Sequence, residues 1–203
     1  MIKLILIVAC FICSSQTFSQ IRDYKTNYHF HFSVLSPFEP LSQERVQLIA
    51  SGRQTISGPS KEKLLWVYSI NDNDYPNIQV LFRPDLSFQK ASFTEIAKTY
   101  KKVLADPAIV RSGEKLLAPI MDLVIAKNGE PVVNINKHSI IYAMKANTKG
   151  YGTLIKITGI FILTNGEANI SFVCRENEIE KYSAHIYQLY NSVIIDNNYQ
   201  HKY

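Results

Sequence analysis

The sequence predicts an α+β protein in which helices cover a mostly antiparallel β-sheet. Residues 28–34 alternate between apolar and polar side chains, as a half-buried strand does. The apolar segments 154–164 and 168–174 flank an Asn-Gly pair, which is a strong signal of a β-hairpin. Segments 92–106 and 176–193 carry apolar residues at helical spacing. Several strands joined by turns, together with amphipathic helices, are typical of an α/β/α sandwich.

The N-terminal part of this domain begins with a strand and a short helix. The polar segment 21–27 leads into the strand at 28–34, which Pro37 ends. A helix is expected over residues 41–50, and the Gly, Ser and Pro residues of segment 51–60 indicate a loop.

The next segment combines a strand pair with the clearest helix. Two apolar strands, 64–70 and 78–82, flank a turn at 71–76 that is rich in Asn, Asp and Pro. Ser92 and Glu95 then form the pattern of a capping box, in which each side chain bonds to the other residue's backbone N–H. The apolar stripe of this helix is expected to pack in the core.

The remaining strands lie in the second half of the chain. Segments 122–126 and 131–135 flank Asn128-Gly129 and predict a hairpin, with Pro131 marking an edge strand. A further strand is expected over residues 139–146.

The chain is expected to close with a hairpin, a long helix and a tail. Asn165-Gly166 favours the positive φ angles of a type I′ turn. Three glutamates occupy the first turns of the helix predicted at 176–193, where the helix dipole favours acids. Its apolar stripe is expected to pack on the sheet, and residues 197–203 to form a polar, frayed tail.

The first residues, 1–19, have the layout of a secretory signal peptide. Lys3 supplies a positive charge, and ten apolar residues follow at 4–13, too few to span a bilayer. Cleavage is expected after Ser19 or Gln20, which predicts a periplasmic or extracellular protein.

Two alternatives to simple secretion remain open. Residues 7–10 resemble a lipobox in which Cys10 is lipidated, and the apolar run could also remain as an uncleaved anchor. Membrane contact is expected only under these alternatives. In all cases residues 20–196 are expected to form a single α+β domain, followed by the tail at 197–203.

Charge and cysteine content restrict the possible partners. The formal net charge of +5 becomes +4 when Lys3 leaves with the signal segment. The basic residues are dispersed, so nucleic-acid binding is not expected. Cys10 and Cys13 also leave, so Cys174 has no internal disulfide partner and its apolar neighbours predict a buried residue.

No motif in the sequence indicates catalysis, a metal or a cofactor. There is no phosphate-binding loop and no Gly-x-Ser-x-Gly elbow. His29 and His31 share the polar face of a predicted strand, but no third ligand lies nearby, so surface histidines are expected. An enzyme would need at least two of six side chains to converge in a cleft: His29, His31, His138, Asp72, Asp74 and Glu130.

Aromatic residues supply the candidate binding surface. Most of the 12 tyrosines and 10 phenylalanines fall on predicted core stripes. Tyr151, Tyr187 and Tyr199 do not, and exposed tyrosines suit a protein partner or a sugar.

The order of elements resembles the Mog1/PsbP-like superfamily, which includes the DcrB-like envelope proteins. The resemblance rests on the aromatic strand that runs into proline at 31–37, the hairpin at 159–174 and the closing helix at 182–192. The end of the signal segment, Gln16 to Gln20, is similar to those of secreted Bacteroidetes proteins. The resemblance implies a protein that binds or assists other proteins, and it implies no catalytic residue.

We therefore expect a secreted or periplasmic, non-enzymatic protein that binds a partner protein in the cell envelope, in an accessory, assembly or immunity-type role. One alternative is a small extracytoplasmic hydrolase or carbohydrate-active protein. Another is a lipid or small-ligand carrier, which would need an apolar cavity of roughly 300 Å³ or more.

Overall fold

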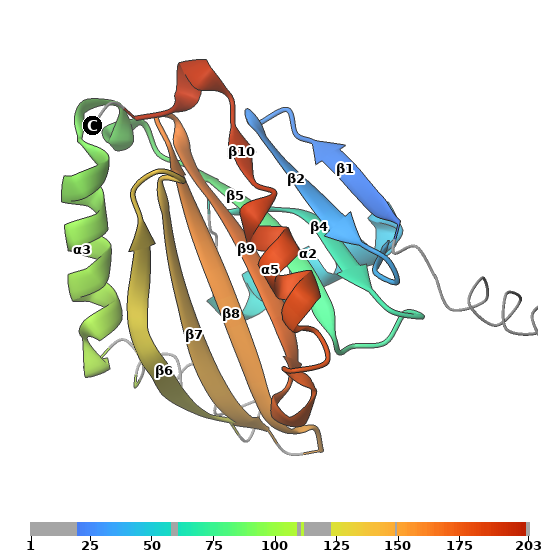
Figure 1. The fold of residues 1–203 in the computed structure, drawn as a ribbon. Helices are drawn as coiled ribbons and strands as arrows, with labels where there is room; N and C mark the ends of the chain where they lie inside the picture. The colour runs from blue at the N-terminus through green and yellow to red at the C-terminus, as the bar shows by residue number, and fades with distance from the viewer. Residues whose placement is uncertain (1–19, 58–60, 109–110, 112–122, 149, 202–203) are drawn as a thin grey trace, which may run out of the picture.

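The described strands form two antiparallel sheets (Figure 1). The computed structural model describes residues 20–57, 61–108, 111, 123–148 and 150–201, and the predicted signal segment lies outside this part of the chain. The larger sheet has the spatial order β3 (Glu39–Pro40), β4 (Lys63–Ser69), β5 (Asn77–Pro84), β9 (Gly166–Arg175), β8 (Gly152–Leu163), β7 (Ser139–Thr148), β6 (Leu123–Asn134). The smaller sheet has the order β1 (Ile21–Lys25), β2 (Phe30–Leu35), β10 (Ile194–Ile195). All paired strands are antiparallel, and the predicted α+β fold class is confirmed.

The larger core lies between the large sheet and a layer made of β2 and α5 (Ser183–Asn191). The alternating strand predicted near the N-terminus forms β2, and its inward side chains Phe30, Phe32 and Val34 are buried. They share this core with Phe172 of the large sheet and Leu189 of α5. Figure 1 shows α5 lying across the sheet beside β10.

The second core lies on the opposite face of the large sheet, beneath α3 (Phe93–Ala105). Strand β8 alternates between the two cores, with Phe161 in the first and Ile160 in the second. The central strands are therefore buried on both faces, as their apolar sequence predicts. The capping box of Ser92 and Glu95 is present at the start of α3.

A buried carboxylate fastens α3 to the sheet. Glu167 of β9 is 4% exposed, and Oε1 lies 3.0 Å from Nε of Arg83 on β5. The hydroxyl of Tyr100 on α3 donates a hydrogen bond to Glu167, and Asn169 donates another at 2.9 Å. Burial raises the pKa of Tyr100, so its hydroxyl stays protonated and able to donate.

Two N-terminal expectations are wrong. Residues 21–25 form the edge strand β1, because the ring of Tyr24 stacks on that of Phe32 with centroids 5.5 Å apart, although the other residues of the strand are exposed. The first helix, α2 (Gln43–Ser57), extends through much of the expected loop, since the sequence has no proline between Leu41 and Gly58 to end it earlier.

The hairpin expected at Asn128-Gly129 is also absent. Residues 123–134 form one long edge strand, β6, whose two halves both pair with β7. The positive φ of Gly129, +84°, serves a bulge between Asn128 and Val132 instead of a chain reversal. The predicted edge position of Pro131 is confirmed.

The β8–β9 hairpin is confirmed, but its turn type is not. Leu163 pairs with Gly166, so the turn residues are Thr164 and Asn165, and neither has a positive φ. The glycine is needed for close packing: a Cβ on Gly166 would lie 2.3 Å from the carbonyl oxygen of Arg83.

The C-terminal helix is shorter than predicted. Residues 176–178 form a 3₁₀ turn, η2, and α5 begins only at Ser183. Tyr182 is buried, and its ring centroid lies 5.8 Å from that of Phe172 on the sheet. This contact brings the chain back onto the sheet before the helix starts. The expected packing of the helix on the sheet is confirmed. No helix in the described part of the chain is long and apolar enough to span a membrane.

The expectation of a frayed tail is wrong for residues 197–201. They form the 3₁₀ turn η3 (Asn197–Tyr199) and a docked end. The carbonyl oxygen of Tyr199 accepts a hydrogen bond from Thr164 N at 3.0 Å, and Nδ1 of the buried His201 lies 3.0 Å from the carbonyl oxygen of Ala91.

Candidate functional site

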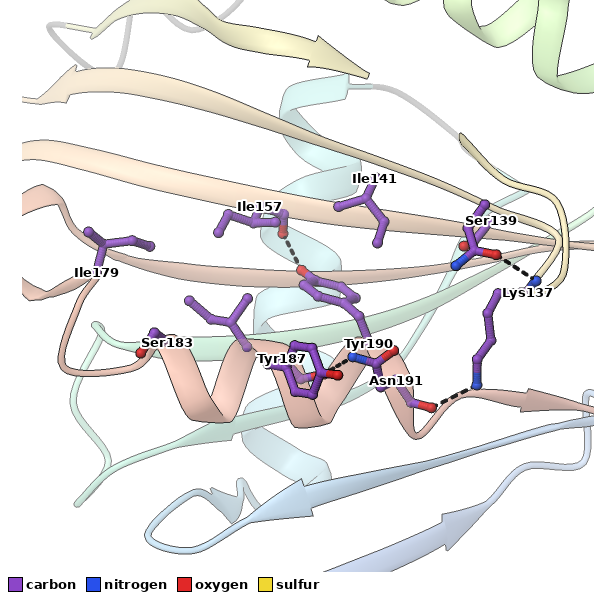
Figure 2. A pocket seen from close by; sticks show the side chains of 11 residues that line it. Lys137, Ser139, Ile141, Ile157, Ile179, Ser183, Tyr187, Tyr190 and Asn191 are labelled. Atoms are coloured by element: carbon purple, nitrogen blue, oxygen red, sulfur yellow. Dashed lines mark hydrogen bonds between the residues drawn. The ribbon is translucent and has the colours of Figure 1, made fainter. Parts of the chain in front are cut away.

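The candidate site is a groove of about 410 Å³ between α5 and the face of strands β7 and β8 (Figure 2). We call it the α5 groove. Eleven residues line it: Asn134, Lys137, Ser139, Ile141, Ile157, Ile179, Ser183, Ile186, Tyr187, Tyr190 and Asn191. Nothing in the sequence indicated it, because its walls come together only when α5 packs on the sheet.

The position of α5 depends on one glycine and one tyrosine. A Cβ on Gly159 would lie 2.8 Å from the ring of Tyr190, so only glycine lets the ring approach β8 this closely. The Tyr190 hydroxyl donates to the carbonyl oxygen of Ile157 at 2.7 Å. Burial raises the pKa of Tyr190, so the hydroxyl remains a donor. These contacts fix one wall of the groove against its floor.

The floor and outer wall of the groove are apolar and accessible. Ile141 and Ile157, on neighbouring strands, are half-buried floor residues. Ile186 and Tyr187 come from consecutive positions of α5, and Tyr187 is 72% exposed. The site is therefore an open groove and not an enclosed cavity, which suits the side chains of a docked segment.

One charged residue contributes to the lining. The Lys137 ammonium donates to the carbonyl oxygen of Asn191 at 2.8 Å and lies 3.5 Å from that of Val193. The ammonium thus stabilises the C-terminal end of α5, where the helix dipole favours a positive charge. Figure 2 shows Lys137 next to Asn191 at this end of the groove. An ammonium has three donors, so one is left for a ligand.

The three candidate tyrosines have different surroundings. Tyr187 lines the α5 groove. Tyr151 lies in the β7–β8 turn, where its hydroxyl donates to Asp74 at 2.9 Å. Tyr199 stacks on His29 with ring centroids 3.6 Å apart. Figure 1 shows the β7–β8 turn and the C-terminal segment at opposite ends of the sheet, so the three do not form one patch.

The histidines form two clusters and one separate contact. The ring nitrogens of His29 and His31 lie 3.6 and 2.8 Å from the carboxylate oxygens of Asp196. Asp196 is so distant in the sequence that this contact could not be predicted. His138 and His201 are buried with ring centroids 6.5 Å apart. Within the described ranges, no group of three or more His, Cys, Asp or Glu is arranged to hold a metal ion. His185, a half-buried residue of α5, bonds to the Ser36 carbonyl oxygen at 3.1 Å.

The six side chains named for a hydrolase do not gather in the groove. The carboxylate of Asp72 lies 3.5 Å from the guanidinium of Arg45, and that of Asp74 accepts a hydrogen bond from the Tyr151 hydroxyl. None of the six lines the α5 groove. Cys174 is fully buried, and burial raises the pKa of its thiol to about 11, so it is not a nucleophile at neutral pH.

The fold places the protein in a recognisable structural class. The fold is PsbP-like: it is similar to the solution structure of cyanobacterial PsbP (CyanoP) from Synechocystis sp. PCC 6803, with a TM-score of 0.52 and 8% sequence identity. The match covers 89% of this chain and 95% of that chain. No family model matches the sequence, and no curated protein matches it. The likeness therefore concerns the fold alone.

Proposed function

We propose that this chain is a non-enzymatic accessory protein outside the cytoplasm and that it binds a partner protein through the α5 groove. The observation that carries the proposal is the open, apolar groove with a single cation at one end. The PsbP-like fold supports it, because it is consistent with an accessory role. The signal-like segment at 1–19 supports the location.

The groove favours an occupant of defined chemistry. The half-buried isoleucines 141 and 157 suit apolar side chains of a partner segment. Lys137 suits an acidic side chain or a terminal carboxylate at the end of that segment. Tyr187 has the properties of a binding hot spot, since it combines a large apolar ring with a polar hydroxyl and is exposed in the free protein.

A ligand carrier is the second candidate, and the volume of the groove favours it. About 410 Å³ lies within the usual range of ligand sites, roughly 300–1,000 Å³. However, such sites bury most of the ligand surface, and the exposure of Tyr187 leaves this groove open on one side. A lipid or small molecule that copurifies with the protein would favour this alternative.

Site-specific photo-crosslinking in the source cell tests the proposal. A photoreactive phenylalanine analogue replaces Tyr187 in one variant and Leu48 of α2 in the control; these residues are 72% and 71% exposed. We expect one protein to crosslink from position 187 and not from position 48. Tyr187→Ala should then weaken binding of that purified protein about tenfold, and Leu48→Ala should leave it unchanged. Equal crosslinking from both positions, or equal affinity of the two variants, would contradict the proposal.

A further inference from the structure

A second hollow lies at the opposite end of the fold from η3, around the turn between β7 and β8. It has a volume of about 550 Å³. Its lining is mainly polar and includes Tyr151, Thr153, Arg175 and Asn177. None of these residues lines the α5 groove, so the two surfaces are separate. A polar hollow with one aromatic ring calls for a different ligand from that of an apolar groove.

The ring of Tyr151 is held in place from two sides. Its hydroxyl donates to Oδ2 of Asp74 at 2.9 Å. Its ring meets that of Tyr75 nearly at a right angle, with centroids 5.2 Å apart. Tyr151 is nevertheless 40% exposed. The residue is therefore an immobilised aromatic surface that loses little conformational entropy when a ligand covers it.

Glycines on both sides of Tyr151 keep the hollow open. Gly150 and Gly152 have φ angles of +94° and +72°, which favour glycine. A Cβ at either position would meet nothing within 4 Å. A ligand can thus approach the backbone next to the ring.

The polar groups around the ring offer both donors and acceptors. Arg175 and Asn177 are exposed, and together they supply guanidinium and amide N–H donors and an amide oxygen. Glu176 is paired with Lys145, so its negative charge is compensated. The described residues that line the hollow therefore carry no strong excess of charge and no large aliphatic side chain, which disfavours anions and lipids.

We propose that this hollow binds a neutral saccharide, with one sugar ring stacked on Tyr151 and its hydroxyl groups bonded to Arg175 and Asn177. The C–H face of a pyranose is apolar and slightly positive, which complements the negative face of an aromatic ring. Its hydroxyl groups both donate and accept, as the side chains around Tyr151 do. This site is independent of the proposed partner groove.

Titration with four linear tetrasaccharides, built from β-1,4-glucose, α-1,4-glucose, N-acetylglucosamine and mannose, tests the proposal. The protein carries ¹³C-labelled tyrosine, and the ring signals of Tyr151, Tyr75 and Tyr187 are followed by NMR. We expect at least one sugar to shift the signals of Tyr151 and Tyr75 but not that of Tyr187. No shift at Tyr151 with any of the four at about 10 mM, a concentration that detects even weak binding, would overturn the proposal.

Variants then separate stacking from folding. For the sugar that binds, Tyr151→Ala should raise the dissociation constant at least about tenfold, and Tyr151→Phe, which keeps the ring, about threefold or less. Arg175→Gln should weaken binding about fivefold through a lost charged donor. Tyr187→Ala should not change it. The thermal midpoint of each variant checks that it folds, and unchanged sugar affinity in a folded Tyr151→Ala protein would also overturn the proposal.

Discussion

The imidazole Nε2 of His31 lies 2.8 Å from Oδ1 of Asp196, and the two residues are 165 positions apart in the sequence. The other carboxylate oxygen of Asp196 lies 3.6 Å from Nδ1 of His29. One acidic side chain thus connects the start of the chain's core strand, β2, to the segment that follows α5. This contact stabilises the docked C-terminal segment that the sequence suggested would be frayed.

Replacing Asp196 should weaken this connection measurably. We expect Asp196→Ala to lower the free energy of unfolding by about 1 kcal/mol, because the side chains are part-buried and the hydrogen bond to His31 is lost. Urea denaturation measures the change. Asp72→Asn is the control, since Asp72 is more exposed and lies 3.5 Å from Arg45, and asparagine tolerates its positive φ of +58°. Equal losses in the two variants would show that the contact with His31 contributes nothing.

The closeness of α5 to the sheet gives a second prediction. Gly159→Ala should lower the free energy of unfolding by about 2 kcal/mol, because the new methyl group overlaps the ring of Tyr190. Combining it with Tyr190→Leu should cost less than the sum of the two single changes, since the overlap with the Tyr190 ring is gone and only that with Phe161, 2.9 Å from the new Cβ, remains. Chemical denaturation of the four proteins in the cycle tests this, and strict additivity would contradict it.

A matched glycine in the helix α2 serves as the control. A Cβ on Gly52 would meet nothing within 4 Å, and Gly52 is exposed inside α2. Gly52→Ala should therefore raise the free energy of unfolding by about 0.5–1 kcal/mol, through the better helix propensity of alanine.

The buried carboxylate beneath α3 gives a third prediction. Glu167→Gln should lower the free energy of unfolding by about 2 kcal/mol, because the charge that faces Arg83 and accepts from Tyr100 is removed from a buried position. Glu180→Gln, at an exposed position, should change it by less than about 0.5 kcal/mol. Similar values for the two variants in urea denaturation would mean that the network does not fasten α3.

The sequence predicted those elements whose signals are local. The capping box of Ser92 and Glu95 and the alternating strand at 30–35 each specify their structure within a few residues. The sequence analysis missed strand β1 because residues 21–27 are mostly polar. The strand forms because it pairs with β2, where Tyr24 stacks on Phe32, and this pairing is not visible in the local sequence.

The candidate site shows the same limit more clearly. Tyr187 was identified because it does not fall on the apolar stripe of its helix. The groove beside it needs Gly159 to admit the ring of Tyr190, and it needs Lys137 from another loop at its end. Side chains from three separate segments define it, so no window of sequence contains its signal.

Buried histidines give the last prediction, a dependence of stability on pH. Burial, and then the charge of nearby His201, lower the pKa of His138. The folded protein therefore binds a proton at this site less readily than the unfolded chain does. The contribution of His138 to the free energy of unfolding is therefore fully present above the ordinary histidine pKa of about 6.5. It is lost as the pH falls below that value. Asparagine tolerates the positive φ of His138, +46°, so His138→Asn is the suitable variant. Between about pH 7.5 and 5.5, the thermal midpoint should fall less in His138→Asn than in the wild type. If both proteins lose the same amount, protonation of His138 does not limit stability in this range.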